Sequence, residues 1–387
     1  MRRTRLKLLS TLILLLFLFA SGVCLNPAFA QVNVTVPDAE PNAGETVTLS
    51  IEADLGSKEV ESYTNMLFVF DDSVIQFEGA RDGEDLSFGS GFFEVENGKD
   101  DTLRVSNVSG SPPVSGSGEF LQIDFTLTQE GGSPVRLLPG NKELSTPIGI
   151  FEDSEATQFE VGGDQGSVGD LSVQNARQQG PSNTATATGI VTRAFGEYIR
   201  FQDNSGPGNS PSGLTVGPVS GDLKQDVGNS ITQGTRIYVR GTLSEPNGLL
   251  RIDGSDVGKH FDLGQGSLPA PQMVSLSTLE TNGEEYESEL VQVNGLSFQN
   301  PSGSFSANTT YTVADAITSL AYQVEGSNQT ELIGKSIPTG TFTYTGVVGE
   351  SNSGYQLVPV RASTALPVTL TGFTAVRNGS SAVLTWR

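Results

Sequence analysis

Apolar and polar residues alternate in short runs along most of the chain after residue 31, and helical periodicity is nearly absent. The clearest run is residues 46–51 (TVTLSI), where Val47, Leu49 and Ile51 would share one face of a strand. Clusters of Gly, Asn, Asp, Ser and Pro separate these runs, as in β-sandwiches and barrels. The pattern predicts an all-β chain, with further strands at residues 66–70, 120–127, 190–191, 198–202 and 237–239.

Glycine-rich joins divide this pattern into modules. Residues 161–167 (VGGDQGS) are polar and rich in glycine, which predicts a flexible linker over residues 161–169. The length of the chain fits two or three domains of roughly 100–200 residues each. The predicted segments are residues 1–30, 31–160, 170–270, 271–365 and 366–387, with the linker between the second and third.

The two segments after the linker show signs of an internal repeat. Residues 241–248 (GTLSEPNG) have a partner in residues 346–354 (GVVGESNSG), and residues 188–191 (TGIV) have one in residues 294–297 (NGLS). The glycines of the two matches are separated by 105 and 106 positions, which is nearly the same offset. Each unit would hold about a hundred residues, the size of a small barrel.

Four motifs of residues 31–160 occur in an order known from one family. Residues 34–37 (VTVP) and 43–49 (AGETVTL) precede a strand within residues 68–75 (FVFDDSVI), and residues 115–125 (SGSGEFLQIDF) place a glycine-rich turn before a long strand. Together they resemble a cohesin domain, although Phe70-Asp71-Asp72 stands where that family has Tyr-Asp-Pro. The resemblance implies a jelly-roll sandwich that binds dockerin modules of polysaccharide-degrading enzymes. The family's motifs do not encode its dockerin-facing residues.

A carbohydrate is the other partner expected for this module, because several carbohydrate-binding modules share its architecture. Flat sugar-binding faces use exposed aromatic rings, and the candidates are Tyr63, Phe92 and Phe93, although the module contains no Trp. Asp71 and Asp72 are expected to form a turn at the strand end that accepts backbone N–H groups. A catalytic carboxylate pair is the alternative.

The region 170–365 carries a second set of motifs, at residues 188–192 (TGIVT), 198–203 (YIRFQD) and 234–243 (GTRIYVRGTL), with an Asn-Gly turn before a short strand. They resemble the OB-fold of bacterial extracellular proteins, some of which also carry nuclease domains. A looser second copy occupies residues 289–295, 311–315 and 340–358. We therefore expect two OB-like barrels, at residues 170–270 and 271–365.

OB-folds bind single strands by stacking bases on aromatic side chains and by following the phosphates with a basic groove. The candidates in the first copy are Tyr198, Arg200 and Gln202 on one strand face, with Arg240 and Arg251 nearby. The second copy offers Tyr311, Tyr322, Tyr355 and Arg361. Because the chain is acidic, its affinity for nucleic acid would be weak and sensitive to salt. Structural spacers or protein-docking modules are the alternative.

The first thirty residues predict export. A cationic start precedes an apolar run at residues 8–20, and residues 28–30 (AFA) form a signal-peptidase site. The run is shorter than the roughly 20 apolar residues of a membrane span, so cleavage before Gln31 is expected and a retained anchor is the alternative. Cleavage removes four basic residues and the only cysteine, Cys24, which changes the formal charge from −22 to −26. This predicts a disulfide-free bacterial protein, secreted or on the cell surface, with no membrane span in the mature chain.

Motifs for catalysis and cofactor binding are missing. His260 is the only histidine, and the chain has no Walker loop, no Rossmann glycine pattern and no EF-hand loop. Ca²⁺ needs only clustered oxygens, which Asp82, Glu84 and Asp85, or Asp100 and Asp101, could provide. Solvated acidic turns are the alternative for these residues. We predict a chain that is not an enzyme and has no cofactor.

The last segment, residues 366–387, contains a Leu-Pro opening and a strand that ends near Trp386. It resembles the start of a fibronectin type III-like module. The modules together predict an exported, non-catalytic scaffold that takes part in polysaccharide degradation. The competing hypothesis is a nucleic-acid-binding accessory array of an extracellular nuclease.

Overall fold

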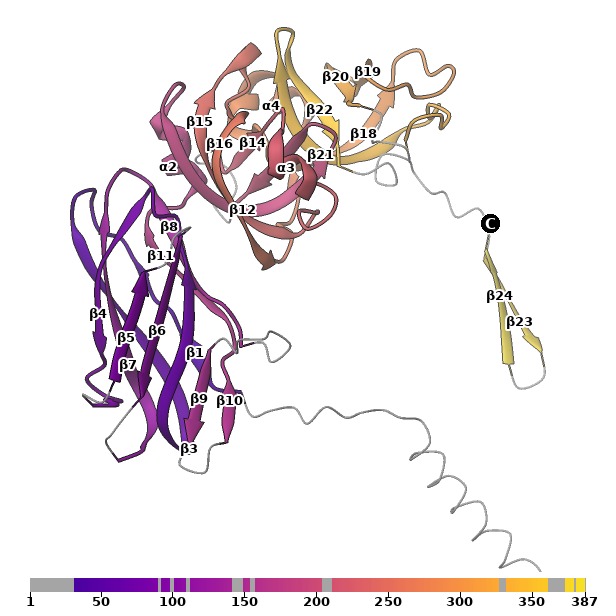
Figure 1. The fold of residues 1–387 in the computed structure, drawn as a ribbon. Helices are drawn as coiled ribbons and strands as arrows, with labels where there is room; N and C mark the ends of the chain where they lie inside the picture. The colour runs from indigo at the N-terminus through magenta and orange to yellow at the C-terminus, as the bar shows by residue number, and fades with distance from the viewer. Residues whose placement is uncertain are drawn as a thin grey trace, which may run out of the picture.

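The computed structural model describes residues 31–89, 92–97, 101–108, 112–140, 149–153, 157–203, 211–326, 332–360, 373–378 and 381–386. Figure 1 shows a long β-sandwich, a group of barrel strands at one end of it, and a separate hairpin near the C-terminus. The predicted all-β class is confirmed, because the regular structure of this part of the chain is mostly strand and includes a sandwich and a closed five-stranded barrel. The predicted signal peptide lies outside the described residues.

The first unit is a sandwich of eleven strands arranged around one long strand, β3 (Thr46–Val69). The first half of β3 pairs with β1 and β7, and the second half pairs with β6, β8 and β9. One strand thereby connects two sets of partners. The other strands are β1 (Asn33–Thr35), β2 (Asp38–Ala39), β4 (Ile75–Asp82), β5 (Phe92–Asn97), β6 (Thr102–Val108), β7 (Val114–Leu127), β8 (Gly132–Leu137), β9 (Ile150–Asp153), β10 (Gln158–Glu160) and β11 (Asp164–Gly169).

The core of the sandwich follows the alternation in the sequence. Leu49 and Ile51 of β3 are buried, and Leu121, Ile123 and Phe125 of β7 face the same core. Each strand therefore buries one face and leaves the other to solvent, as packed antiparallel sheets require. Aromatic rings fill the centre of this core in edge-to-face contacts, for which offset geometries are preferred.

The second unit is the closed barrel β12-β13-β14-β16-β15. Its strands are β12 (Thr184–Phe195), β13 (Tyr198–Gln202), β14 (Gly213–Val216), β15 (Thr235–Ser244) and β16 (Arg251–Gln265), and the strands expected at residues 190–191, 198–202 and 237–239 lie within them. A short helix, α2 (Val173–Gln179), precedes β12, and its N-cap Ser172 accepts a hydrogen bond from the amide of Asn175. Between the later strands lie α3 (Gly221–Asp226) and the 3₁₀ turn η1 (Pro246–Gly248).

The third unit repeats this pairing order. Its strands are β17 (Gln272–Met273), β18 (Leu290–Phe298), β19 (Thr309–Ala314), β20 (Ser319–Val324), β21 (Phe342–Ser351) and β22 (Gly354–Pro359). The path β18-β19-β20-β22-β21 returns to β18, and β20 pairs with β22 in parallel, as β14 does with β16. A helix, α4 (Leu276–Asn282), and the turn η2 (Gly283–Tyr286) precede β18, as α2 precedes β12.

The topology supports the internal repeat. Gly189 and Gly295 lie on β12 and β18, and Gly241 and Gly346 lie on β15 and β21, which occupy equivalent positions in the two rings. The sequence matches therefore fall on equivalent strands. The assignment of both units to the OB-fold stays a prediction.

The prediction of a flexible linker at residues 161–169 is wrong. Residues Asp164–Gly169 form β11, which pairs antiparallel with β8 and parallel with β2. The glycines here serve close packing, since a Cβ on Gly166 would lie 2.1 Å from the carbonyl oxygen of Pro37. The carboxylate of Asp164 accepts a hydrogen bond from the amide of Val36 at 2.7 Å. The segment is therefore part of the sandwich, although its polar, glycine-rich composition is typical of a flexible linker.

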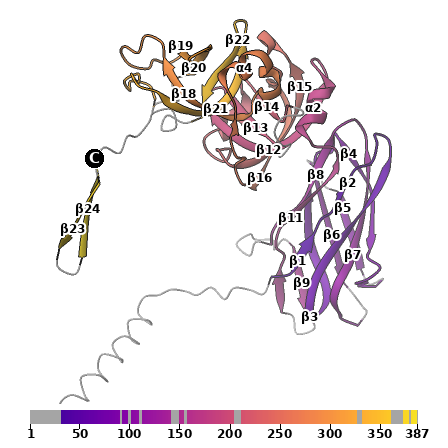
Figure 2. The same ribbon diagram turned by 180° about the vertical axis from the view of Figure 1, so that it is seen from behind.

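The C-terminal strands β23 (Phe373–Asn378) and β24 (Ser381–Trp386) form an antiparallel hairpin. The fibronectin type III-like assignment of this segment stays a prediction. Figure 2, seen from behind, shows the same three groups of strands. Within the described ranges, no helix is both long and apolar enough to cross a membrane.

Candidate functional site

A buried carboxylate, that of Asp71, follows the end of β3 and bonds to residues of both the sandwich and the first barrel. This side chain is fully buried, and one of its oxygens accepts a hydrogen bond from the backbone amide of Ser73 at 3.1 Å. The expected turn that accepts a backbone N–H group is therefore confirmed at Asp71. The amide of Asp71 itself donates to the hydroxyl of Ser133 at 2.8 Å.

The other oxygen of Asp71 is bonded by two residues of the first barrel. The Tyr238 hydroxyl donates to it at 2.9 Å and the Arg240 Nε at 2.7 Å. Burial raises the pKa of Tyr238 well above its usual value, and the charge of Asp71 adds to this effect, so the phenol remains a donor. Nearby, the amide of Gly132 donates to the Thr186 hydroxyl at 2.8 Å. Strands β12 and β15 are thereby attached to one end of the sandwich.

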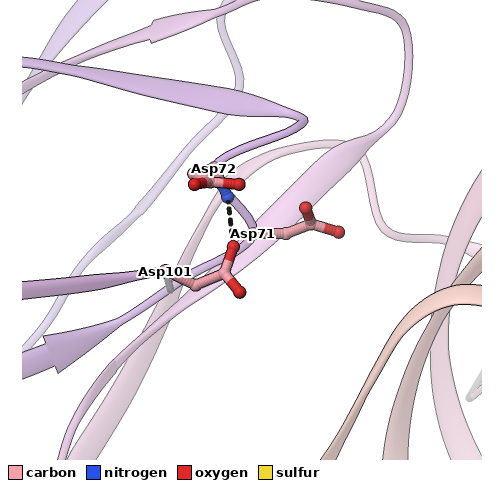
Figure 3. Close-up of side chains that lie close together, drawn as sticks. All are labelled: Asp71, Asp72 and Asp101. Atoms are coloured by element: carbon pink, nitrogen blue, oxygen red, sulfur yellow. Dashed lines mark hydrogen bonds between the residues drawn. The ribbon is translucent and has the colours of Figure 1, made fainter. Parts of the chain in front are cut away.

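Asp72 and Asp101 complete an acidic cluster with Asp71, drawn in Figure 3. The amide of Asp72 donates to the Asp101 carboxylate at 3.0 Å, and Lys259 of β16 forms an ion pair with Asp101. The hydrogen bond between the two carboxylates, with burial and the charges of Asp101 and Asp71, raises the pKa of Asp72. Burial opposes ionisation of Asp101, but Lys259 and the Asp72 amide outweigh it, so the pKa of Asp101 is lowered.

The three carboxylates could in principle hold a cation, because one oxygen of each lies within 4.8 Å of the others. Their remaining contacts favour another role. Arg240 and Lys259 already supply positive charge to Asp71 and Asp101, and both cations come from the first barrel. The cluster is therefore an electrostatic junction between two units, and we assign no metal and no catalysis to it.

A second junction joins the two barrels. Arg193 of β12 and Arg200 of β13 both form ion pairs with Glu325, at 2.8 Å and 2.9 Å. Burial raises the pKa of Glu325, but the two guanidinium groups outweigh this effect and lower its pKa to about 2. The side-chain oxygen of Gln202 accepts a hydrogen bond from the amide of Leu290 at 2.7 Å. Polar residues of the first barrel thus bind backbone and carboxylate groups of the next unit.

The same junction holds a second buried carboxylate, that of Glu287. Arg177 of α2 forms ion pairs with Glu287 at 2.9 Å and with Glu284 at 2.7 Å. Burial raises the pKa of Glu287 to about 7, although the nearby Arg177 acts in the opposite direction. In addition, the Ser212 hydroxyl donates to Glu289 at 2.7 Å. Glu284, Glu287 and Glu350 form another carboxylate group among the described residues, with Arg177 as its cation.

These contacts change the interpretation of the predicted nucleic-acid face. Arg200 and Gln202 are buried against the second barrel, and Arg240 is paired with Asp71, so the expected open cationic strand face is wrong for these three residues. Tyr198 and Arg251 do lie together, with the Arg251 guanidinium 5.9 Å from the centre of the Tyr198 ring. Of the second copy, Tyr322 is fully buried.

The aromatic residues predicted to stack on sugars also differ in their exposure to solvent. Tyr63 is fully buried in contact with Phe88 and Phe120, so its proposed role on an open face is wrong. The strand bulges between Tyr63 and Met66, which breaks the alternation that the sequence would predict. Phe93 packs partly against the core, whereas Phe92 keeps 60% of its surface exposed.

Two of the carboxylates considered for Ca²⁺, those of Asp82 and Asp85, accept hydrogen bonds within the sandwich. Asp82 accepts from the Ser87 hydroxyl, the Gly89 amide and the side-chain amide of Asn107, and Asp85 accepts from the Glu119 amide. Asp100 lies outside the described residues. His260 is partly buried and bonds to Asp226 at 2.9 Å.

The sequence model of the Cohesin domain family matches residues 32–138. These residues are a cohesin domain. The chain is also similar to several solved cohesins, each at low identity. These include the sixth cohesin of scaffoldin B from Acetivibrio cellulolyticus, in complex with a mutant Cel5 dockerin, at 19% identity over 36% of this chain and 99% of that one, with a TM-score of 0.30.

Two further solved structures belong to the same group. One is the seventh ScaB type I cohesin of Pseudobacteroides cellulosolvens, at 16% identity over 36% of this chain and 94% of that one, with a TM-score of 0.30. The other is a non-cellulosomal cohesin of Archaeoglobus fulgidus, at 15% identity over 39% of this chain and 99% of that one, with a TM-score of 0.29. No curated protein matches the chain.

The cohesin domain of this chain uses its altered strand end for a contact with the next unit. Asp71 occupies the Asp position of the Phe-Asp-Asp sequence at residues 70–72, and it binds Tyr238 and Arg240. Sequence reasoning identified Asp71 as a turn residue and missed its partners. The partners lie 167 and 169 positions away along the chain, so no local pattern marks them.

Proposed function

We propose that this chain is a non-catalytic scaffold, secreted or held at the cell surface, whose cohesin domain binds a dockerin module of a polysaccharide-degrading partner. The family match of residues 32–138 carries the proposal. Solved cohesins similar to this one include several in complexes with dockerins. Export and the link to polysaccharide degradation belong to the same proposal.

The exposed face of β5 and β6 is the surface we assign to this partner. Phe92 and Val108 are directly opposite each other in the β5–β6 register, and they keep 60% and 47% of their surfaces exposed. Together they form an exposed apolar pair, and buried aromatic residues often dominate the binding energy of protein interfaces. Among the described pairings, β5 pairs only with β6 and so forms an edge.

Polar groups continue this face along β5 and β6 on one side of the apolar pair. Glu96 on β5 lies 3.8 Å from Arg104 on β6, and Arg104 donates to the side chain of Asn65 at 3.1 Å. The amide of Asn65 in turn donates to the Ser106 hydroxyl at 2.9 Å. Apolar residues next to hydrogen-bonded polar groups are typical of specific protein interfaces.

The position of the face is compatible with the barrel contact. Val108 ends β6, whereas Asp101 precedes the other end of β6 and pairs with Lys259 of the barrel. The apolar pair and the junction therefore lie at opposite ends of one strand. A partner on Phe92 and Val108 would leave the junction intact.

A binding experiment with the whole chain tests the proposal. Dockerin modules from polysaccharide-degrading enzymes are titrated into the wild-type protein and into Phe92→Ala and Val108→Ser. We expect at least one dockerin to bind and each substitution to weaken that binding tenfold or more. The matched control is Ile317→Ser, which removes an apolar side chain that is 89% exposed on the second barrel and should leave binding unchanged.

Two results would count against this function. If no dockerin in the panel binds, the dockerin proposal is rejected. If one binds equally well to both face variants, the β5–β6 surface is rejected as its site.

A further inference from the structure

The two barrels line a polar cavity of about 660 Å³ that is open to solvent. The first barrel contributes Tyr198, Lys224 and Arg251 to its lining, and the second contributes Asn308, Gln323 and Gln356. Small-molecule sites in proteins usually have volumes of about 300–1,000 Å³ and lie where domains meet. The cavity lies outside the cohesin domain.

Tyr198 is held firmly in the wall of this cavity. A Cβ on Gly217 would lie 2.4 Å from the Tyr198 ring, so only glycine allows the ring to pack at this place. The guanidinium groups of Arg200 and Arg251 lie 5.5 Å and 5.9 Å from the centre of the ring. These distances are within the range of cation–π attraction. The ring and the Arg251 guanidinium are thus positioned before any ligand arrives, which lowers the entropy cost of binding.

The cavity concentrates cations that have no carboxylate partner. The chain has 44 acidic and 22 basic residues, and Arg177, Arg193, Arg200 and Arg240 are all paired with carboxylates. Neither Lys224 nor Arg251 makes an ion pair with any carboxylate of the described residues, and the buried Nε of Arg251 has no hydrogen-bond partner. Behind them, Glu325 faces two arginines. Lys224 and Arg251 could therefore bind a negatively charged group of a ligand, although the chain as a whole is strongly acidic.

The remaining lining suits hydroxyl groups. The side-chain amide of Gln356 offers donors and an acceptor, and the carboxylates of Glu197 and Glu350 can accept hydrogen bonds. The oxygen of Asn308 accepts from the Gly326 amide, which leaves its amino group as a donor, and the Gln323 amide is bonded to Thr310 and Val324. Carboxylates beside the cations would repel a ligand with several negative charges. The lining therefore fits a ligand with one negative group on a body rich in hydroxyls.

We propose that the cavity between the barrels binds an acidic saccharide, a sugar whose carboxylate lies against Arg251 and Lys224 and whose hydroxyls bond to the amide side chains. A single-stranded nucleic acid fits the site less well. Such a strand needs a basic groove that follows several phosphates, and the cavity has only two uncommitted cations in its described lining.

Calorimetric titration of the full chain tests this site. The probes are aldotriouronic acid, which is a trisaccharide with a single carboxylate, its methyl ester, and a ten-residue oligothymidylate. We expect aldotriouronic acid to bind, with affinity that falls as salt is added, and the neutral ester to bind at least tenfold more weakly. Arg251→Gln and Lys224→Gln should each weaken aldotriouronic acid binding tenfold or more. Arg236→Gln, which changes an exposed arginine of β15 outside the cavity lining, should have no effect.

The unfolding midpoint of each variant separates loss of binding from loss of folding. Lys224 lies on the exposed side of α3, so its substitution keeps the test valid even if Arg251→Gln lowers stability. Three results would overturn the proposal: no binding of aldotriouronic acid at millimolar concentration, equal binding of the ester, or oligothymidylate binding that Arg251→Gln removes. None of them depends on whether the cohesin domain binds a dockerin.

Discussion

The carboxylate of Asp71, at the end of β3 in the cohesin domain, accepts a hydrogen bond from the Nε of Arg240 in the first barrel at 2.7 Å. Asp71 is fully buried, so its charge depends on Arg240 and on the hydroxyl of Tyr238. An ionised carboxylate without such partners is costly to bury. Removal of one partner should therefore affect the junction between the two units as well as local packing.

Arg240→Met tests this junction. The substitution keeps an apolar stem but leaves the Asp71 charge without its guanidinium, and loss of one partner of a buried pair typically costs about 3–5 kcal/mol. We expect the free energy of unfolding to fall by an amount near the lower end of this range, as measured by urea denaturation. Arg81→Met is the matched control, because Arg81 pairs with Asp124 at 2.6 Å but is half exposed. Exposed pairs contribute about 0–1 kcal/mol. Equal effects of the two substitutions would contradict the role of Arg240.

Glu325→Gln should destabilise the junction between the barrels at neutral pH. It leaves Arg193 and Arg200 buried without a counter-ion, for which we expect a loss of about 3–5 kcal/mol. The pKa of Glu325 is lowered to about 2 in the folded chain, below its ordinary value of 4.5. Its stabilising effect is therefore complete above pH 4.5 and is lost as the pH falls from there towards 2. The stability difference between wild type and Glu325→Gln should shrink over this interval in denaturation curves. A constant difference would show that the carboxylate charge does not stabilise the junction.

Glu287 should give a pH dependence of opposite sign. Its pKa is raised from 4.5 to about 7 in the folded chain, so the folded state binds the proton more tightly than the unfolded state. This group therefore favours folding below pH 4.5, and its contribution decreases as the pH rises from 4.5 to 7. Glu287→Gln cannot titrate, so the stability of the wild type relative to this variant should decrease across that interval. Thermal unfolding at four pH values between 4.5 and 7.5 measures it. A relative stability that stays flat or rises would reject the raised pKa.

Substitutions at Tyr63 and Phe92 test the separation of the candidate aromatics into core and surface. Tyr63→Ala removes a ring whose centre lies 5.0 Å from that of Phe120, and truncation of a buried aromatic residue to Ala typically costs about 3–5 kcal/mol. Tyr63→Phe keeps the ring and should cost much less. Phe92→Ala, at an exposed position, should change the free energy of unfolding by no more than about 0.5 kcal/mol. Urea denaturation of the three variants measures these differences, and a large loss in Phe92→Ala would show that its ring supports the core.

The parts of the fold that depend on local pattern could be predicted from the sequence. The alternation at Leu121, Ile123 and Phe125 identified a strand with one buried face, and the matched glycines identified two units with the same strand order. The order of four motifs identified the first module, although its Phe-Asp-Asp strand end departs from the family sequence. These features repeat every two residues or follow a family order, so they can be read along one segment.

The errors arose where a distant segment decides the environment. Arg200 and Gln202 have the alternation of an open strand face, but the second barrel covers them. Tyr63 lies next to a bulge, which shifts its side chain into the core. Residues 161–169 have the composition of a tether, but their backbone pairs with β8. In each case the deciding contact is formed by residues far away in the sequence.

Strand β11 has a consequence for how bound partners would meet. It ends at Gly169, and α2 begins at Val173, so only three residues lead from the sandwich to the first barrel. Flexible tethers let two bound ligands sample many separations, and their effective concentration then depends on tether length. Here the paired strand and the ion pairs of Asp71 and Asp101 replace that sampling. A partner on the cohesin domain would therefore be held at one distance and in one orientation from a ligand in the barrels. Whether the two can touch would depend on this fixed distance and orientation, and not on the length of a tether.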